Sequence, residues 1–255
     1  MFEQIYIRMA EKSPVPPTIA SSMHSDPYSG QSGAATGDKI NGIHLIVLVH
    51  GFQGNSFDMR VLKNNLSILH PEALFLCSNK NEGKTEEDMT EMGARLAQEV
   101  IDYVQEWCPG TTLGMLSFVG HSLGGVIIRA ALPYLKAFQD KMETFVTLSS
   151  PHLGYMYASN TIVDAGLWVL KRWKKSKCLE QLTMTDATEY QKTFIFQLST
   201  QPGLSWFKNV LLVSSYQDRY VPVESARMEL MQKAIDDEKY SLTILTLALG
   251  KDQYI

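Results

Sequence analysis

The residues with the clearest capacity for chemistry are Gly120, Ser122 and Gly124, which form the pattern Gly-x-Ser-x-Gly. An apolar run over 116–119 precedes them, and apolar residues at helical spacing over 126–135 follow them. A serine on so tight a strand-to-helix turn needs almost no side chain two residues before and after it, which glycine provides. The pattern predicts that Ser122 is a nucleophile near a helix N-terminus, rather than an incidental serine in a glycine-rich turn.

A second glycine-containing turn, His50-Gly-Phe-Gln-Gly54, follows the apolar run 43–49. A serine that cleaves esters needs two backbone N–H donors where the oxyanion forms, and the loss of one costs about 10²- to 10³-fold in rate. Leu123, directly after Ser122, is one candidate. His50-Gly51 alone is equally compatible with an ordinary turn at a strand end, so its functional interpretation depends on the Gly-x-Ser-x-Gly pattern downstream.

Asp218 follows Ser122 in the chain and lies shortly after an apolar run over 210–213. An aspartate near a strand end beyond the nucleophile is the expected partner of a base histidine, in the chain order Ser, Asp, His. The alternative interpretation of Asp218 is an aspartate of a surface turn. Asp186 is a weaker substitute for the acid.

The base histidine is missing from its expected place, because none of the six histidines follows Asp218: they are His24, His44, His50, His70, His121 and His152. His121 flanks the nucleophile and is expected to point away from it, which leaves His152 as the remaining candidate near the predicted cleft. Removal of the base from a serine triad costs about 10⁶-fold in rate. Two explanations stay open: the chain is truncated or spliced before the histidine, or the fold serves as a non-catalytic module.

The elements that must position these residues alternate between strands and helices. Apolar runs predict strands over 43–49, 73–77, 116–119, 144–148 and 210–213. Helical spacing predicts helices over 57–69, about 85–107 and 126–135, the second of which opens with a capping box at Thr85 to Asp88. This alternation implies right-handed crossovers, and hence a mostly parallel sheet with helices on both faces.

The two ends and one internal stretch depart from this alternation. Residues 2–9 are compatible with a short strand, but 11–42 are rich in Ser, Pro, Gly and Ala, so residues 1–42 are predicted to be a flexible leader. Residues 43–255 then form one domain, with a cap or lid insertion over about 152–207. The centre of this insertion, 161–175, has apolar residues at helical spacing and ends in a cluster of basic residues. A packed surface helix is the alternative, and direct membrane contact is a weaker interpretation. An apolar tail, 241–249, predicts a final strand.

Composition excludes several classes of protein. The chain has 255 residues, 45% of them hydrophobic, and 23 basic against 27 acidic side chains, a net charge of −4 that argues against a nucleic-acid partner. The three cysteines lack the spacing of a disulfide framework or a zinc site. With no signal peptide and no long apolar stretch, we expect a cytoplasmic protein. No metal or organic cofactor is implied, and the oligomeric state is not fixed by the sequence.

Together, the turn at His50, the Gly-His-Ser-Leu-Gly elbow and Asp218 resemble an α/β-hydrolase over residues 43–228. More closely, 50–60, 150–154 and 217–222 resemble the serine esterase, lipase-like domain of the proteins named "family with sequence similarity 135". The resemblance implies that Ser122 attacks a carboxylic ester of a small molecule or lipid, that the Phe52 and Leu123 amides hold the oxyanion, and that Asp218 orients a later histidine. Since no later histidine is present, the competing implication is a catalytically impaired fold that binds a lipid or a partner.

Overall fold

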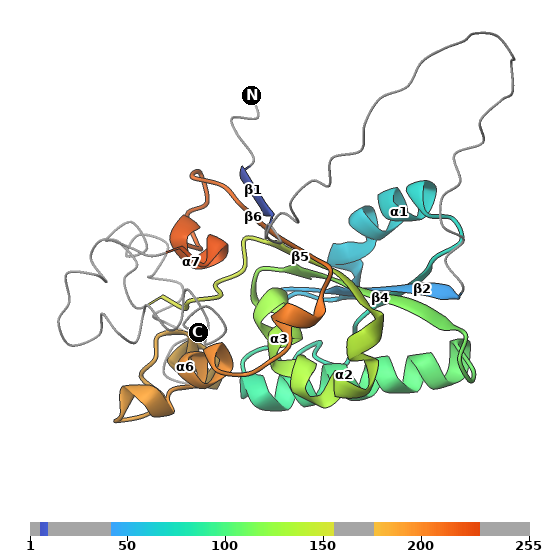
Figure 1. Cartoon of the computed structure of the whole chain (residues 1–255). Helices are drawn as coiled ribbons and strands as arrows, with labels where there is room; N and C mark the ends of the chain where they lie inside the picture. The colour runs from blue at the N-terminus through green and yellow to red at the C-terminus, as the bar shows by residue number, and fades with distance from the viewer. Residues whose placement is uncertain (1–5, 10–41, 156–175, 230–255) are drawn as a thin grey trace, which may run out of the picture.

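The computed structural model describes residues 6–9, 42–155 and 176–229 (Figure 1). Within these residues one sheet has the strand order β1-β6-β5-β4-β2-β3. Strands β2 to β6 are mutually parallel and span Ile43–Val49, Leu74–Cys77, Leu113–His121, Met142–Leu148 and Asn209–Ser214. Strand β1, Tyr6–Met9, runs antiparallel to β6, with Tyr6 opposite Ser214. The prediction of a mostly parallel sheet is confirmed.

Helices cover both faces of this sheet, as predicted (Figure 1). Helix α1, Arg60–Leu69, lies on one face after a short 3-10 turn, Ser56–Met59, whereas α2, Met89–Trp107, and α3, Leu123–Ala131, lie on the other. Side chains of β2 alternate between the two cores. Ile46 and Leu48 pack with Met59, and their neighbours Leu45, Val47 and Val49 pack with α2 and α3. Because both faces are covered, the strand has a continuous apolar sequence.

The remaining short elements lie after α3 and around the predicted insertion. They are η2 (Leu132–Lys141), α5 (Lys177–Leu182), η3 (Tyr190–Lys192), α6 (Phe194–Ser199), η4 (Leu204–Trp206) and α7 (Val223–Arg227). Helix α5 contacts both α2 and α6. The centre of the predicted cap, most of the predicted leader and the predicted strand over 241–249 lie outside the described residues.

The predicted capping box at Thr85 is wrong. Helix α2 begins at Met89, and its N-cap is Asp88, whose carboxylate accepts hydrogen bonds from the N–H groups of Thr90 and Glu91 at 2.7 and 3.3 Å. The Asp88 carboxylate lies directly beside the first N–H groups of the helix, which have no acceptor within the helix. Because Asp88 accepts their hydrogen bonds, Thr85 is not needed as a cap. The Thr85 side chain is instead buried and binds the turn after β2.

Other boundaries also differ from the prediction, most clearly in three places. The segment 57–69 starts as a 3-10 turn, and Leu69, one of the apolar residues at helical spacing, is 72% exposed. Strand β4 is longer than 116–119 and reaches His121. Helix α3 begins at Leu123 and gives way to η2 at Leu132, because Pro133 has no N–H to continue the α-helical ladder.

Candidate active site

Ser122 lies on the turn between β4 and α3, in a backbone conformation that few residues adopt. Its φ is 51° and its ψ is −123°, and its N–H donates to the Leu148 carbonyl at 2.8 Å. A non-glycine residue in such a region is strained and persists only where its surroundings fix it. The turn ends directly at the N-terminus of α3, whose first N–H groups have no acceptor within the helix.

The glycines on either side of Ser122 are required by the packing of this turn. A Cβ on Gly120 would lie 2.5 Å from the Gly125 nitrogen, and a Cβ on Gly124 would overlap the Val49 carbonyl oxygen. Both obstacles are backbone atoms, which cannot move aside as a flexible side chain can. The spacing Gly-x-Ser-x-Gly therefore follows from the close approach of β4, α3 and the end of β2.

The turn after β2 lies directly against the nucleophile. A Cβ on Gly51 would lie 2.9 Å from the Ser122 Cβ. Within this turn the Gly54 N–H donates to the Gly51 carbonyl at 3.1 Å, and Gln53 has a φ of 53°. The His50 ring is buried, and its Nδ1 donates to the Gly51 carbonyl at 3.0 Å. The structure thus brings the two turns together that the sequence places far apart.

Phe52 and Leu123, the two predicted oxyanion donors, lie on these two adjoining turns. Leu123 is the first residue of α3, and its side chain is buried in the main core. Phe52 directly follows Gly51, and its ring packs against the same core. Leu123 directly follows Ser122, and Phe52 follows Gly51, which lies against Ser122. The assignment of their N–H groups as oxyanion donors remains a prediction.

Asp218 lies on the turn between β6 and α7. Its Oδ1 accepts hydrogen bonds from the N–H groups of Tyr220 and Val221 at 2.8 and 3.0 Å. Strand β5 separates β6 from β4, so Asp218 and Ser122 follow parallel strands at the same edge of the sheet. Burial and the charge of Asp218 raise the pKa of Tyr155. No hydrogen bond joins Asp218 to Ser122 among the described residues.

Asp186, the weaker candidate for the acid, lies in a different environment from Asp218. Its Oδ2 accepts from the Phe194 N–H at 2.8 Å, at the start of α6, while its buried Oδ1 has no hydrogen-bond partner within the described part of the chain. Burial raises the pKa of this carboxyl group. These contacts indicate that Asp186 fixes the start of α6.

Five of the six histidines lie in the described residues, and none of these five forms a hydrogen bond with the Ser122 hydroxyl. The Nε2 of His44 interacts with Ser117 Oγ at 2.8 Å, near the opposite end of β2. His70 follows α1 at its C-terminus, and His121 is exposed. The sixth, His24, is outside the described residues.

His152, the remaining candidate for the base, is completely buried. Its Nε2 interacts with Thr147 Oγ1 at 3.0 Å, and its ring centroid lies 6.0 Å from that of Phe145. The Arg129 guanidinium donates to the His152 carbonyl at 2.9 Å. Burial and the Arg129 charge lower the pKa of His152 well below its ordinary value. These contacts describe a core histidine and give no support to a role as base.

The described residues contain neither a cluster of metal ligands nor a helix that could span a membrane. Among these residues no group of three or more His, Cys, Asp or Glu side chains is placed to hold a metal ion. No helix in the same residues has both the length and the apolar character needed to cross a bilayer. The three cysteines are free, and Cys108 and Cys178 are buried.

The fold and the site together define the class of the protein. A serine on a strained turn between a parallel strand and a helix, followed in the chain by an aspartate after a later strand, is the arrangement of the α/β-hydrolases. The predicted fold class is confirmed. The chain belongs to the family described as "Putative serine esterase (DUF676)", whose model matches residues 39–231. The finer resemblance to the "family with sequence similarity 135" proteins stays a prediction.

Two similar proteins are from the yeast Saccharomyces cerevisiae. The chain is 28% identical over 212 residues to "Putative lipase YDL109C" of Saccharomyces cerevisiae, which covers 74% of this chain and 32% of that protein. It is 26% identical over 223 residues to "Putative lipase ROG1" of the same organism, covering 78% of this chain and 32% of that protein. The chain thus spans about a third of the length of these relatives.

Solved structures of lipases are also similar. The mature form of Bacillus licheniformis lipase BlEst2 is 22% identical, with a TM-score of 0.45, and the match covers 69% of this chain and 67% of that chain. Aspergillus fumigatus lipase B is 18% identical, with a TM-score of 0.38 and coverage of 50% and 29%. Likeness at this level gives no information on the reaction of this chain.

Proposed function

We propose that this chain is a serine hydrolase of the esterase or lipase type, which cleaves a carboxylic ester. The observation that carries the proposal is the strained Ser122 at the start of α3 with Gly51 directly against it. A serine on a strained turn between a strand and a helix presents its hydroxyl at the edge of the sheet, where a substrate can reach it. Family membership supports the same reaction class.

In the proposed reaction the Ser122 hydroxyl attacks the ester carbonyl and loses its proton to a base. The Phe52 and Leu123 N–H groups donate to the oxyanion of the tetrahedral intermediate. Collapse of the intermediate releases the alcohol, which takes the proton from the base, and leaves an acyl-enzyme. Water then hydrolyses the acyl-enzyme by the same steps. In this scheme Asp218 orients a histidine base, a place that none of the five histidines in the described residues occupies.

The substrate in this proposal is an ester of a small molecule or of a lipid. The printed names of the yeast relatives, which are putative lipases, support the lipid class. The competing function is a fold that binds a lipid or a partner without catalysis. One observation favours it: none of the five histidines in the described residues forms a hydrogen bond with the Ser122 hydroxyl.

A fluorophosphonate probe tests the proposal, because it phosphonylates only a serine that is activated as a nucleophile. The purified chain should be labelled at Ser122 and should hydrolyse short-chain p-nitrophenyl esters. The Ser122→Ala variant should lose both reactions, whereas Ser67→Ala, on helix α1, should keep both. Equal hydrolysis by the parent and by Ser122→Ala, without labelling, would contradict the proposal and support the non-catalytic function.

A further inference from the structure

The turn that carries Phe52 is held by a side chain from a distant segment. The Gln53 N–H donates to Thr85 Oγ1 at 2.8 Å, and the Gln53 side-chain Nε2 donates to Glu86 Oε1 at 2.6 Å. Thr85 is only 2% exposed. Because Gln53 directly follows Phe52, the backbone hydrogen bond to Thr85 fixes the chain next to a proposed oxyanion donor, and the side-chain bond to Glu86 adds a second link to the same segment.

Gln53 needs such support because of its backbone conformation. Its φ of 53° lies in the left-handed region, which glutamine adopts rarely. A residue in this region keeps its conformation only where neighbouring groups over-determine it. Within the turn, Gly54 bonds to the Gly51 carbonyl, but the Gln53 N–H finds its acceptor on Thr85. The Thr85 hydroxyl therefore contributes directly to the shape of the turn.

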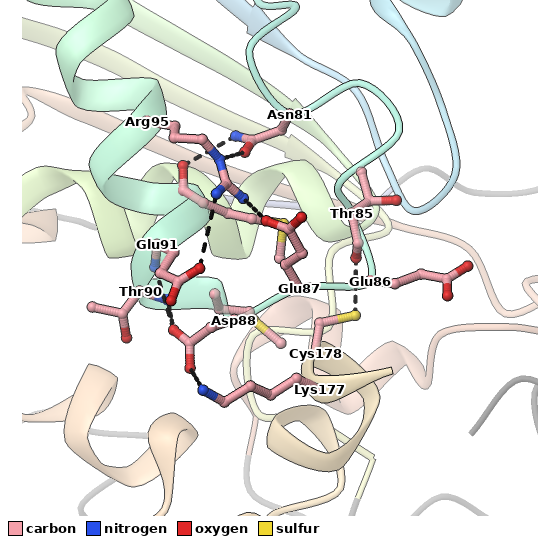
Figure 2. A network of polar contacts seen from close by, with 12 residues as sticks. Asn81, Thr85, Glu86, Glu87, Asp88, Thr90, Glu91, Arg95, Lys177 and Cys178 are labelled. Carbon is pink, nitrogen blue, oxygen red and sulfur yellow. Dashed lines mark hydrogen bonds and ion pairs between the residues drawn. The ribbon is translucent and has the colours of Figure 1, made fainter. Parts of the chain in front are cut away.

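Thr85 is itself fixed by the start of α5 (Figure 2). The Cys178 Sγ donates to the Thr85 carbonyl at 3.0 Å, and the Lys177 N–H donates to the Glu86 carbonyl at 2.9 Å. The Lys177 ammonium pairs with Asp88 Oδ2 at 2.8 Å. Burial raises the pKa of Cys178 to about 12, so its thiol keeps the proton that it donates.

We propose that Thr85 is a positioning residue for the oxyanion turn, and that Cys178 supports it from α5. The inference rests on the proposed esterase function. Helix α5 lies in the region predicted as the cap insertion, and its first residues are linked to the oxyanion turn through Thr85 and Glu86. Neither Thr85 nor Cys178 contacts the reacting atoms; each acts through the position of the Phe52 N–H.

The first experiment compares Thr85→Val, which has nearly the same shape but no hydroxyl, with Thr85→Ser, which keeps the acceptor. Displacement of a catalytic group by about 1 Å costs about 10²-fold in rate. We expect Thr85→Val to lower kcat for p-nitrophenyl esters by about 10- to 100-fold with KM within about twofold. Thr85→Ser should stay within about threefold of the parent in kcat. Thr112→Val, which loses an exposed hydroxyl that bonds to Pro109, should match the parent.

The second experiment measures the rate of amide hydrogen exchange at Gln53, which reports directly on the hydrogen bond that holds the turn. The Gln53 N–H should exchange at least about tenfold faster in Thr85→Val than in the parent, and at nearly the parent rate in Thr85→Ser. Cys178→Ala should raise the same exchange rate, and Cys178→Ser, which retains a donor, should restore it. Equal Gln53 exchange in the parent and in Thr85→Val would overturn the inference. So would a loss of kcat in Thr85→Ser as large as that in Thr85→Val.

The two proposals fail in different ways. A parent chain with no labelling and no hydrolysis above that of Ser122→Ala contradicts the esterase function, whatever the exchange of Gln53. An active parent with unchanged kcat in Thr85→Val contradicts the role of Thr85 and leaves the esterase function intact. Circular dichroism and thermal unfolding of each variant separate these outcomes from failure to fold.

Discussion

Gly51 lies so close to Ser122 that a Cβ on the glycine would be 2.9 Å from the serine Cβ. The two residues follow adjacent parallel strands, since Val49 of β2 is paired with Gly120 of β4. The contact therefore joins the turn that carries Phe52 to the turn that carries the proposed nucleophile. Any side chain at position 51 must separate them.

The Gly51→Ala variant tests this contact. Its methyl group would also lie 3.1 Å from the His121 carbonyl oxygen, so one of the two turns has to move. We expect kcat for ester hydrolysis to fall at least about tenfold, since small displacements of catalytic groups are costly. The added methyl group should also lower the free energy of unfolding by about 1–3 kcal/mol. Steady-state kinetics and urea unfolding measure the two effects.

Gly83→Ala provides the control for Gly51→Ala. No atom lies within 4 Å of a Cβ on Gly83, but its φ is +70°, so alanine is strained there. This variant should lose about 1 kcal/mol of stability and keep its activity. Equal activity of Gly51→Ala and the parent would show that the contact does not position the nucleophile.

Backbone strain at Ser122 leads to a prediction on stability. A non-glycine residue in such a region costs about 1–3 kcal/mol, and glycine relieves most of this cost. The free energy of unfolding of Ser122→Gly should therefore be about 1 kcal/mol higher than that of Ser122→Ala, so the glycine variant is the more stable of the two. Both variants should be inactive. Urea unfolding of the two proteins measures the difference.

Ser67 supplies the matched comparison, because it lies in the regular helix α1. There the glycine variant should be less stable than the alanine variant by about 1 kcal/mol, the opposite sign. If Ser122→Gly were also less stable than Ser122→Ala, the backbone at Ser122 would not be strained.

Much of this fold could be predicted from local patterns. Strand β2 is a continuous apolar run because both of its faces are buried, and the spacing of Gly120, Ser122 and Gly124 follows from backbone contacts. The bond from Gln53 to Thr85 has no such signal. It joins residues 32 positions apart and depends on how two loops meet in space. The sequence from Thr85 to Asp88 also fits a capping box. Whether Thr85 caps the helix or accepts a hydrogen bond from Gln53 depends on tertiary packing.

Asp218→Asn distinguishes the acid of the proposed triad from a turn aspartate. Asparagine keeps a carbonyl oxygen that can accept from the Tyr220 and Val221 N–H groups, so the turn should stay folded. Loss of the charge should lower kcat by up to about 10⁴-fold, and the rate of Ser122→Ala sets the lower limit that can be measured. Steady-state kinetics against that background give the measurement.

Asp186→Asn is the matching variant for the weaker candidate. Because Asp186 bonds to the start of α6, its asparagine variant should change kcat by less than about threefold. A large loss of kcat in Asp186→Asn together with a small loss in Asp218→Asn would identify Asp186 as the acid and Asp218 as an aspartate of a surface turn.

The buried His152 predicts a pH dependence of stability. Burial and the Arg129 charge hold its folded-state pKa well below 6.5, the value of a free histidine. Above about pH 6.5 both states are neutral at this residue, so its contribution to stability is constant. As the pH falls below about 6.5 the unfolded chain binds a proton that the folded chain does not, so the free energy of unfolding decreases. The decrease ends once the pH passes the lowered folded-state pKa.

The His152→Gln variant removes this titration. Between pH 7 and pH 5 the parent should lose up to about 2 kcal/mol more stability than the variant, because one proton gives at most about 1.4 kcal/mol per pH unit. Urea unfolding at several pH values measures the two slopes. Val47→Ala, a core substitution that removes no titratable group, should be less stable but keep the slope of the parent. Identical slopes for the parent and His152→Gln would place the His152 ring in contact with water, and would return it to the candidates for the base.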